Sequence, residues 1–332
     1  MWKKINLAVS LIVGIVIFII TLRYFGLESI KIIYENINPV YLLAYVLFTV
    51  LVFVFNSWRL QVILKAYRKK VPLLTLIRQN IAGFAMAYVT PSVKLGGEPL
   101  KAYMLKKENN IRLRIGSSAV IIDKFVEIIG TVFVGIIGLV ILFFIPQIPS
   151  NLKIALGVIV IISSAVLYLI YYRTIKRKGI FTSLFRILRI YKITRWKFIF
   201  KKMAAVELKM HKFFTSNKKE FLISFLLYIA YFAINIIEFK FLFLSFGINV
   251  SVIEIILTIV VIGIVNFIPV PAALGFLEIS QSGLFSLLKN SAGIGLAFSL
   301  IIRLRNIIFT VIGFGIISHF SGEQLINRNG KR

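Results

Sequence analysis

The sequence predicts an all-α polytopic membrane protein. Of its 332 residues, 59% are hydrophobic, and the mean hydropathy of +0.93 is far above that of a soluble domain of this length. Apolar runs of about 20 residues are long enough to cross a hydrocarbon core of about 30 Å. We find six such runs, at residues 5–22, 39–58, 115–144, 152–172, 221–246 and 292–318. We expect a single membrane domain over residues 1–332, with a first half at 1–150 and a second half at 220–332.

The charges between the apolar runs predict the topology. The formal net charge is +28, and Lys and Arg cluster after the second and fourth runs, whereas residues 145–151 and 245–251 carry no charge. An excess of Lys and Arg marks cytoplasmic loops, so we expect both termini to be cytoplasmic and the protein to lie in the plasma membrane. We attribute the basic charge to loops that face anionic lipid, and we expect no nucleic-acid partner. No small-residue cleavage site follows the first run, which we therefore interpret as an uncleaved first helix.

Two further apolar pieces are interrupted, and we expect each to form a broken or re-entrant hairpin. Residues 73–106 enter from the cytoplasmic side, break at Pro91 and continue into a lysine-rich stretch on the side from which they came. Residues 252–289 are interrupted by "NFIPVPAALGFLE", which contains Pro269 and Pro271. This second piece either dips in from the outside or crosses twice, and both alternatives preserve the topology.

The basic segment at residues 173–219 contains apolar residues at helical spacing among many lysines. Those residues are Trp196, Ile199, Phe200, Met203, Val206, Met210 and Phe213. We expect an amphipathic helix that lies on the cytoplasmic leaflet. The alternative is a charged linker.

The two hairpins share a spacing of prolines and charged residues. In each, a proline precedes a glutamate by seven residues, and a charged residue follows 25 residues beyond that glutamate. The two sets are Pro91, Glu98 and Asp123, and Pro271, Glu278 and Arg303. This echo fits an inverted repeat in which two broken helices enter from opposite faces and form a substrate site near the midplane.

The residue types at the breaks are suited to binding an anion. A backbone that leaves helical geometry in hydrocarbon is tolerated where it is buried in protein or lines a wet cavity. A half-helix that starts near Gly97 would aim N–H groups and a positive dipole end at a phosphate or carboxylate, with Glu98 stabilising its first turn. The alternative for Gly96 and Gly97 is close helix packing.

Ionisable residues inside apolar runs are further candidates, because each costs roughly 2.5–3.5 kcal/mol at a helix centre. Asp123 and Glu127 share a helical face, either as a polar wall or with Glu127 paired to Lys124. We expect Arg303 to face the cavity, pairing with Glu278 or binding a phosphate. Glu238 is a candidate that could equally form a surface pair with Lys240. Trp58 and Arg59 read as an interfacial anchor.

Sequence motifs for enzymes are largely missing. The chain has no Cys and only two His, and we find no phosphate loop, no zinc signature and no His-based triad. We therefore expect no metal, no cofactor and no catalytic residues, and we consider transport more plausible than chemistry.

The motifs "TPSVKLGGEPLKAYML", "IIDKFVEIIG" and "FIPVPAALGFLE" resemble the flippase-like membrane domain of lysylphosphatidylglycerol synthases. The resemblance covers nearly the whole chain and implies movement of a modified lipid between leaflets. Its motif positions correspond to Pro91, Gly96, Glu98, Lys101, Asp123, Pro269, Pro271, Gly275, Glu278 and Arg303. The family usually has Gly-Gly after the second proline, whereas this chain has Ala272 and Ala273, which should stiffen that loop. Since no soluble aminoacyl-transfer domain follows the last span, we do not expect this protein to make the lipid itself.

Three functions remain open at this stage. The first is a flippase that moves an anionic phospholipid or a polyprenyl phosphate. The second is a membrane enzyme that uses a lipid-phosphate carrier for glycosyl or aminoacyl transfer, with Glu98 or Asp123 as base. The third is a membrane partner that docks a soluble enzyme; a homo-oligomer is also possible. For the flippase, we expect the substrate to contact Gly96, Gly97, Glu98, Lys101, Asp123, Glu127, Gly275, Glu278 and Arg303.

Overall fold

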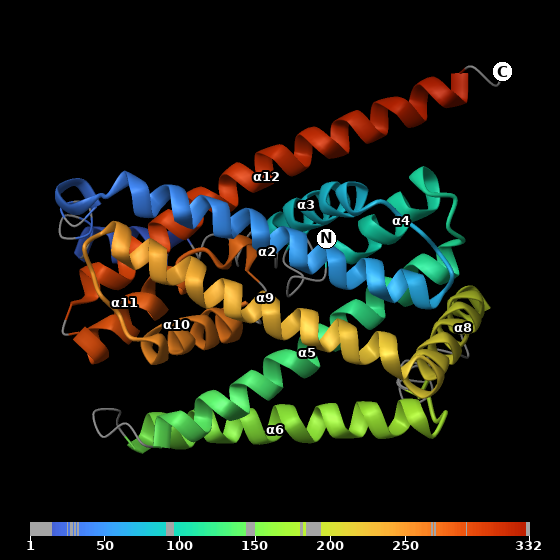
Figure 1. The fold of residues 1–332 in the computed structure, drawn as a ribbon, viewed down its shortest axis with the longest axis horizontal. Coiled ribbons are helices and arrows are strands. Elements are labelled where there is room, and N and C mark those ends of the chain that lie inside the picture. The colour runs from blue at the N-terminus through green and yellow to red at the C-terminus, as the bar shows by residue number, and fades with distance from the viewer. Residues whose placement is uncertain are drawn as a thin grey trace. The chain divides into compact units, whose positions relative to one another are not determined.

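Five of the six predicted membrane helices are present in the computed structural model of the chain (Figure 1), and residues 5–14 of the other lie outside the described residues. The structure describes residues 15–24, 26, 29, 31, 33–90, 96–143, 150–179, 182–183, 194–266, 268, 270–289 and 291–329, and across these ranges every regular element is a helix. Five long helices match predicted spans: α2 (Pro39–Ala66), α5 (Leu113–Phe143), α6 (Ser150–Ile175), α9 (Lys218–Ser245) and α12 (Ala292–Asn329). Residues 15–24 are also helical. The predicted breaks at Pro91 and Pro269 lie outside the described residues.

Four helices are long and apolar enough to cross a membrane by length and composition. Among the described residues they are α2, α9, residues Lys153–Ile175 of α6 and residues Ala292–Ser321 of α12. The expectation of an all-α multi-pass membrane protein is therefore confirmed.

The two interrupted pieces each contain two shorter helices. α3 (Leu73–Val89) and α4 (Glu98–Glu108) make up the first, and α10 (Val252–Val265) and α11 (Phe276–Lys289) make up the second, with one 3-10 turn, η2 (Pro271–Ala273), between α10 and α11. α10 starts at a capping box: the Ser251 hydroxyl accepts from the Glu254 N–H while the Glu254 carboxylate accepts from the Ser251 N–H. This reciprocal pair fixes the point at which the chain turns into α10.

The chain divides into two compact units. The first unit comprises residues 1–53, 77–100 and 232–332, and the second comprises residues 54–76 and 101–231. Helices α2, α3, α4 and α9 each contribute residues to both units.

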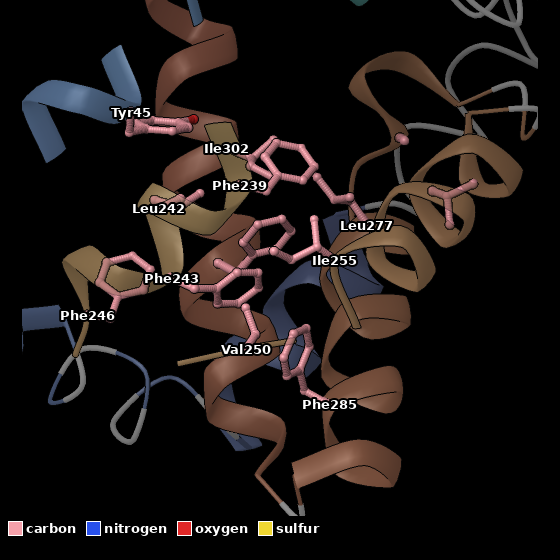
Figure 2. Close-up of a cluster of buried hydrophobic side chains, with 13 residues drawn as sticks. Tyr45, Phe239, Leu242, Phe243, Phe246, Val250, Ile255, Leu277, Phe285 and Ile302 are labelled. Carbon is pink, nitrogen blue, oxygen red and sulfur yellow. The ribbon is translucent and has the colours of Figure 1, made fainter. Parts of the chain in front are cut away.

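Aromatic side chains form the core of the first unit, where α9, α10, α11 and α12 meet (Figure 2). The Phe243 ring stacks on the Phe298 ring with centroids 4.6 Å apart and planes 3° apart. Phe239 meets Phe298 edge to face, and Phe285 lies 5.1 Å from Phe243. Such pairs are worth about 0.5–1.5 kcal/mol each beyond their buried area. The core therefore fixes α9 against the broken helix pair α10–α11 and against α12.

The second unit is built on α5, α6 and α8 (Thr194–Ser216), which contact one another (Figure 1). Val206, Met210 and Phe213 of α8 are buried. This part of the apolar face packs against protein, whereas the side chains of Trp196, Ile199 and Phe200 lie outside the described residues. The position of α8 on the cytoplasmic leaflet stays a prediction. Two further contacts fix α8: the Tyr67 hydroxyl donates to the Lys209 carbonyl at 3.0 Å, and the Lys209 ammonium lies 5.4 Å from the Tyr67 ring.

A close backbone contact joins α3 to the start of α4 within the first unit. A Cβ atom on Gly97 would lie 1.9 Å from the carbonyl oxygen of Gly83, and Gly97 is buried. The packing alternative for this glycine is therefore the one that the structure supports. Only a residue without a side chain lets the chain enter α4 at this distance.

The helix bounds repeat along the chain. Adding 180 to the bounds of α2, α3, α4 and α5 gives 219–246, 253–269, 278–288 and 293–323. The observed bounds of α9, α10, α11 and α12 are 218–245, 252–265, 276–289 and 292–329. The helix bounds thus recur at an offset of about 180 residues, and the spacing echo in the sequence falls within this pattern. We call α2–α5 the first repeat and α9–α12 the second repeat.

The contact at Gly97 yields a stability prediction. Gly97→Ala should destabilise the purified protein by at least about 1–3 kcal/mol, because its methyl group would overlap backbone that cannot rotate away. Gly263→Ala in α10 is the control, since a Cβ there meets no atom within 4 Å; it should be neutral or slightly stabilising. Thermal unfolding in detergent, followed by circular dichroism, measures both. Equal melting temperatures for the two variants would contradict the described contact.

Candidate functional site

The break between α10 and α11 contains backbone in left-handed conformations. Ala272 has φ 55° and Ala273 has φ 48°, followed by Gly275 with φ 79°. A left-handed conformation costs roughly 1–2 kcal/mol in a residue with a Cβ, and little in glycine. Ala272 and Ala273 thus form a strained turn. The family that this chain resembles usually has two glycines at these positions. Surrounding contacts must stabilise this turn.

Glu278 and Arg303 hold the turn in place. The Glu278 carboxylate is fully buried; its Oε2 accepts the Gly275 N–H at 2.9 Å and its Oε1 accepts Arg303 Nε–H at 2.5 Å. Arg303 Nη1 lies 3.3 Å from the Tyr88 hydroxyl and 3.4 Å from the Ala272 carbonyl oxygen. The expected Glu278–Arg303 pair is therefore present. It ties α11 and α12 to the strained turn, and Tyr88 adds α3.

A second buried ion pair lies in the same unit. Glu238 on α9 is fully buried, and its Oε1 accepts from Arg305 Nη1 at 2.5 Å and from the Thr49 hydroxyl at 2.6 Å. The alternative that Glu238 pairs with Lys240 is wrong, because Lys240 donates instead to Asn249 and to the Val250 carbonyl. Glu238 points into the helix bundle, whereas Lys240 bonds to the loop that follows α9.

The first unit contains a cavity of about 80 Å³ beside these ion pairs. Its polar lining comes from Arg305, Asn306, Asn266, Thr90 and Tyr88, and its remaining lining residues are apolar or aromatic. A water-sized probe needs roughly 10–15 Å³, so the space holds a few waters or one small polar group. Neither Arg303 nor Glu278 lines it. The cationic residue at the cavity is Arg305, two positions beyond the arginine that we had expected there.

Asn306 orients the Arg305 guanidinium. Its Oδ1 accepts from Arg305 Nε at 3.2 Å and from Nη2 at 3.1 Å. This bidentate contact leaves Nη1 directed at Glu238, and the Arg305 side chain is 21% exposed. Asn306 and Glu238 therefore orient the planar guanidinium of Arg305 before a ligand binds.

The second unit contains a separate cluster around Arg59. This arginine is 1% exposed; its Nε donates to Asp123 at 2.6 Å and its Nη2 donates to Glu127 at 3.1 Å. Lys124 also pairs with Glu127 at 3.0 Å, and Lys101, itself buried, interacts electrostatically with Glu127. The interpretation of Arg59 as an interfacial anchor is wrong. The sequence showed only that Arg59 lies at the end of a predicted span. Its partner Asp123 lies on another helix, α5, and could not be recognised from the sequence.

The predicted site residues are distributed over both units. Gly96, Gly97, Glu98, Gly275, Glu278 and Arg303 belong to the first unit, and Lys101, Asp123 and Glu127 belong to the second. Within the units, the structure brings together Gly275, Glu278 and Arg303, and it brings together Asp123 and Glu127 through Arg59. Glu98 is the first residue of α4. The polar cavity-lining residues that we had not selected are Tyr88, Thr90, Asn266, Arg305 and Asn306.

A metal site is not evident in the part of the chain that the structure describes, which has no group of three His, Asp or Glu side chains arranged to hold an ion. The chemistry available in the first unit is that of a positioned guanidinium, an amide and two hydroxyls around a small space. These groups recognise an anionic oxygen by charge-assisted hydrogen bonds.

Comparisons with known proteins agree with the family resemblance. A family model described as "Lysylphosphatidylglycerol synthase TM region" matches residues 6–313. A UPF0104 membrane protein of Methanothermobacter thermautotrophicus is 27% identical over 139 residues, which cover 41% of each chain. Another, from Methanocaldococcus jannaschii, is 26% identical over 119 residues, which cover 36% of this chain and 35% of the relative. The matched segments thus span well under half of these relatives. No solved structure matches the chain.

The strained turn yields a prediction opposite to the usual effect of glycine. Ala272→Gly and Ala273→Gly should each stabilise the protein by about 0.5–1 kcal/mol, because relief of the left-handed strain exceeds the added entropy of the unfolded chain. Ala297→Gly, at a fully buried position inside α12, is the control and should destabilise by about 1 kcal/mol. Unfolding by denaturant in detergent gives the three values. Destabilisation by all three variants would rule out the strained turn.

The Arg59 cluster yields a second prediction. Arg59→Met should destabilise the protein by about 3–5 kcal/mol, because Asp123 would remain buried without its cation. The exposed pair Lys31–Glu35, 4.0 Å apart, supplies the control: Lys31→Met should change stability by less than about 1 kcal/mol. Thermal unfolding of both variants in the same detergent measures the two changes in stability. A small effect at Arg59 would mean that its ion pair is not buried.

Proposed function

Because this chain belongs to the lysylphosphatidylglycerol synthase TM region family, we propose that it is a lipid translocase. In this proposal it moves a phospholipid or a lipid-linked head group between the leaflets of the plasma membrane. The observation that supports it best is the cavity of the first unit, where Arg305 and Asn306 lie beside a broken helix pair in a multi-pass membrane protein. Irregular backbone and a buried cation at such a position typically mark a substrate pathway.

The proposed topology has six spans and two hairpins, α3–α4 and α10–α11, with both termini in the cytoplasm. The positive-inside pattern of the loops supports this arrangement. The repeat of helix bounds at an offset of 180 supports it too. If α3–α4 returns to the side that it left, α2 and α9 run in opposite directions, as an inverted repeat requires. The basic segment at 173–219 then lies on the cytoplasmic side, where it attracts anionic lipid.

The proposed substrate is an anionic lipid, either a phospholipid or a polyprenyl phosphate. A small cavity with a single guanidinium suits one phosphate group better than a whole head group. Arg305 and Asn306 contact the phosphate, while Glu278 and Arg303 keep the break open. Gly96 and Glu98, at the start of α4, serve the corresponding part of the pathway in the first repeat.

Translocation is favoured over a transferase that uses Asp123 as its base by the burial of the Asp123 carboxylate. A general base needs an accessible lone pair near the reacting proton. Asp123 is 1% exposed and accepts from Arg59 at 2.6 Å, so it has no access to a substrate hydroxyl. Binding and movement require no such base.

A leaflet-exchange assay tests the proposal. Wild-type protein in liposomes should move labelled phosphatidylglycerol or labelled polyprenyl phosphate between leaflets. The double variant Arg305→Gln/Glu238→Gln removes the cation and its partner together, so that no buried charge is left unpaired; it should lose at least about tenfold in rate, the equivalent of about 1.4 kcal/mol. Lys31→Gln, at an exposed position, is the control.

Two results would argue against the proposal. One is equal lipid movement by wild type and the double variant while both stay folded by circular dichroism, which would place the pathway elsewhere. The other is formation of product from a lipid-linked sugar by the purified protein, which would favour the transferase.

A further inference from the structure

Glu238 and Glu278 are both fully buried, yet their carboxylates are used differently. Both oxygens of Glu278 are bonded, one to the Gly275 N–H and one to Arg303. Glu238 uses only Oε1, which accepts from Thr49 and Arg305. Among the described residues, Glu238 Oε2 is buried and has no hydrogen-bond partner. A buried carboxylate oxygen without a donor is the position where a proton can be added with the least loss of existing bonds.

The charges around the cavity balance before a ligand binds. Arg303 and Arg305 contribute two positive charges, and Glu278 and Glu238 contribute two negative charges. The neighbouring titratable groups are neutral tyrosines, Tyr45 on α2 and Tyr88 on α3, which interact electrostatically with these ion pairs. Lys240 on α9 bonds to the loop at Asn249, and Glu254 on α10 caps its own helix. An entering anion would therefore leave an uncompensated negative charge in a low-dielectric space, which is costly.

We propose that Glu238 is a proton-binding residue that couples anion binding to proton uptake. When a phosphate oxygen binds Arg305, Glu238 takes one proton from the aqueous phase and releases Arg305 Nη1. When the anion leaves, Glu238 loses that proton and reforms the ion pair. The charge of the cavity is then the same before and after binding. This inference rests on the proposed function, because it assumes that Arg305 is the residue that binds the anionic head group.

The arrangement of Arg305 favours such an exchange. Asn306 holds Nε and Nη2 of the guanidinium, so that Arg305 keeps its orientation when Nη1 leaves Glu238. Thr49 stays on Glu238 Oε1, which lets Oε2 carry the proton. Glu278 cannot substitute for Glu238, since a proton on either of its oxygens would break the contact to Gly275 or the contact to Arg303. Protonation at Glu278 would release the strained turn instead.

Calorimetry on the full chain in detergent tests the coupling. The probes are dihexanoyl phosphatidylglycerol and dimethyl phosphate, both of which stay singly charged near neutral pH. Each is titrated in two buffers of different ionisation enthalpy, which gives the number of protons taken up per bound anion. Wild type should take up close to one proton, and its affinity should fall about tenfold for each unit of rising pH, as linkage requires. Binding of the lipid alone would identify a lipid head group as the ligand. Binding of both probes would identify phosphate itself.

Variants assign the proton. Glu238→Gln should bind the probe with no proton uptake and with an affinity that does not depend on pH. Glu254→Gln, at an exposed helix cap, and Tyr45→Phe should keep the uptake of wild type. Uptake that persists in Glu238→Gln would overturn the assignment. If this variant does not fold, the proton count of wild type still decides, since a value near zero overturns the coupling.

The outcomes also separate this inference from the proposed function. Binding of phosphatidylglycerol without proton uptake by wild type would reject the coupling and leave lipid binding intact. No binding of either probe between pH 6 and pH 8, about one unit on each side of neutrality, would reject both.

Discussion

The pairing of charges inside apolar helices is the constraint on which this structure depends. An arginine or carboxylate at the centre of a membrane helix costs roughly 2.5–3.5 kcal/mol on insertion scales, and an unpaired charge in the folded interior costs more. Three pairs meet this constraint here: Arg303 with Glu278, Arg305 with Glu238, and Arg59 with Asp123. Each pair joins two helices at one rotation and one register, because a slip of one residue would point the charge into lipid or aromatic core. Buried ion pairs therefore specify the arrangement of the helices more than they stabilise it.

The starts of five membrane helices could be predicted from the sequence to within three residues, although α2 and α12 end well beyond their predicted ends. The partners of the buried charges could not be predicted. The span at 152–172 becomes α6 at Ser150–Ile175, because helix length follows from the thickness of hydrocarbon alone. Which face of a helix meets which neighbour depends on side chains far away in the sequence. We interpreted Arg59 as an interfacial anchor because its partner Asp123 lies 64 residues further along the chain. We considered a pair between Glu238 and Lys240 because these two residues are close in sequence. Local reasoning likewise did not indicate that Val206, Met210 and Phe213 of α8, a helix that contacts α5 and α6, would be buried.

The strained turn illustrates a different limit. The pair Ala272 and Ala273 reads as an ordinary stiff loop, and no propensity scale predicts left-handed backbone at two alanines. The conformation is imposed by contacts made after the chain folds, above all by the Arg303 guanidinium on the Ala272 carbonyl oxygen and by Glu278 on the Gly275 N–H. In the family that this chain resembles, two glycines usually occupy these positions. That pattern indicated that the backbone adopts positive φ there. Strain that is held by a buried ion pair is released when that pair breaks.

Each of the two repeats contains an interhelical ion pair, and the positions of cation and anion are exchanged between them. In the first repeat α2 supplies the cation, Arg59, and α5 supplies the anion, Asp123. In the second repeat the equivalent helix α9 supplies the anion, Glu238, and α12 supplies the cation, Arg305. Either arrangement of cation and anion is tolerated in the hydrocarbon core, because each pair has no net charge. The polarity matters only for a ligand: an arginine at the cavity wall presents donors to an anion, whereas a carboxylate there would repel it. Charge reversal between the corresponding helices therefore makes the two halves unequal in the charge of the ligand that each would accept.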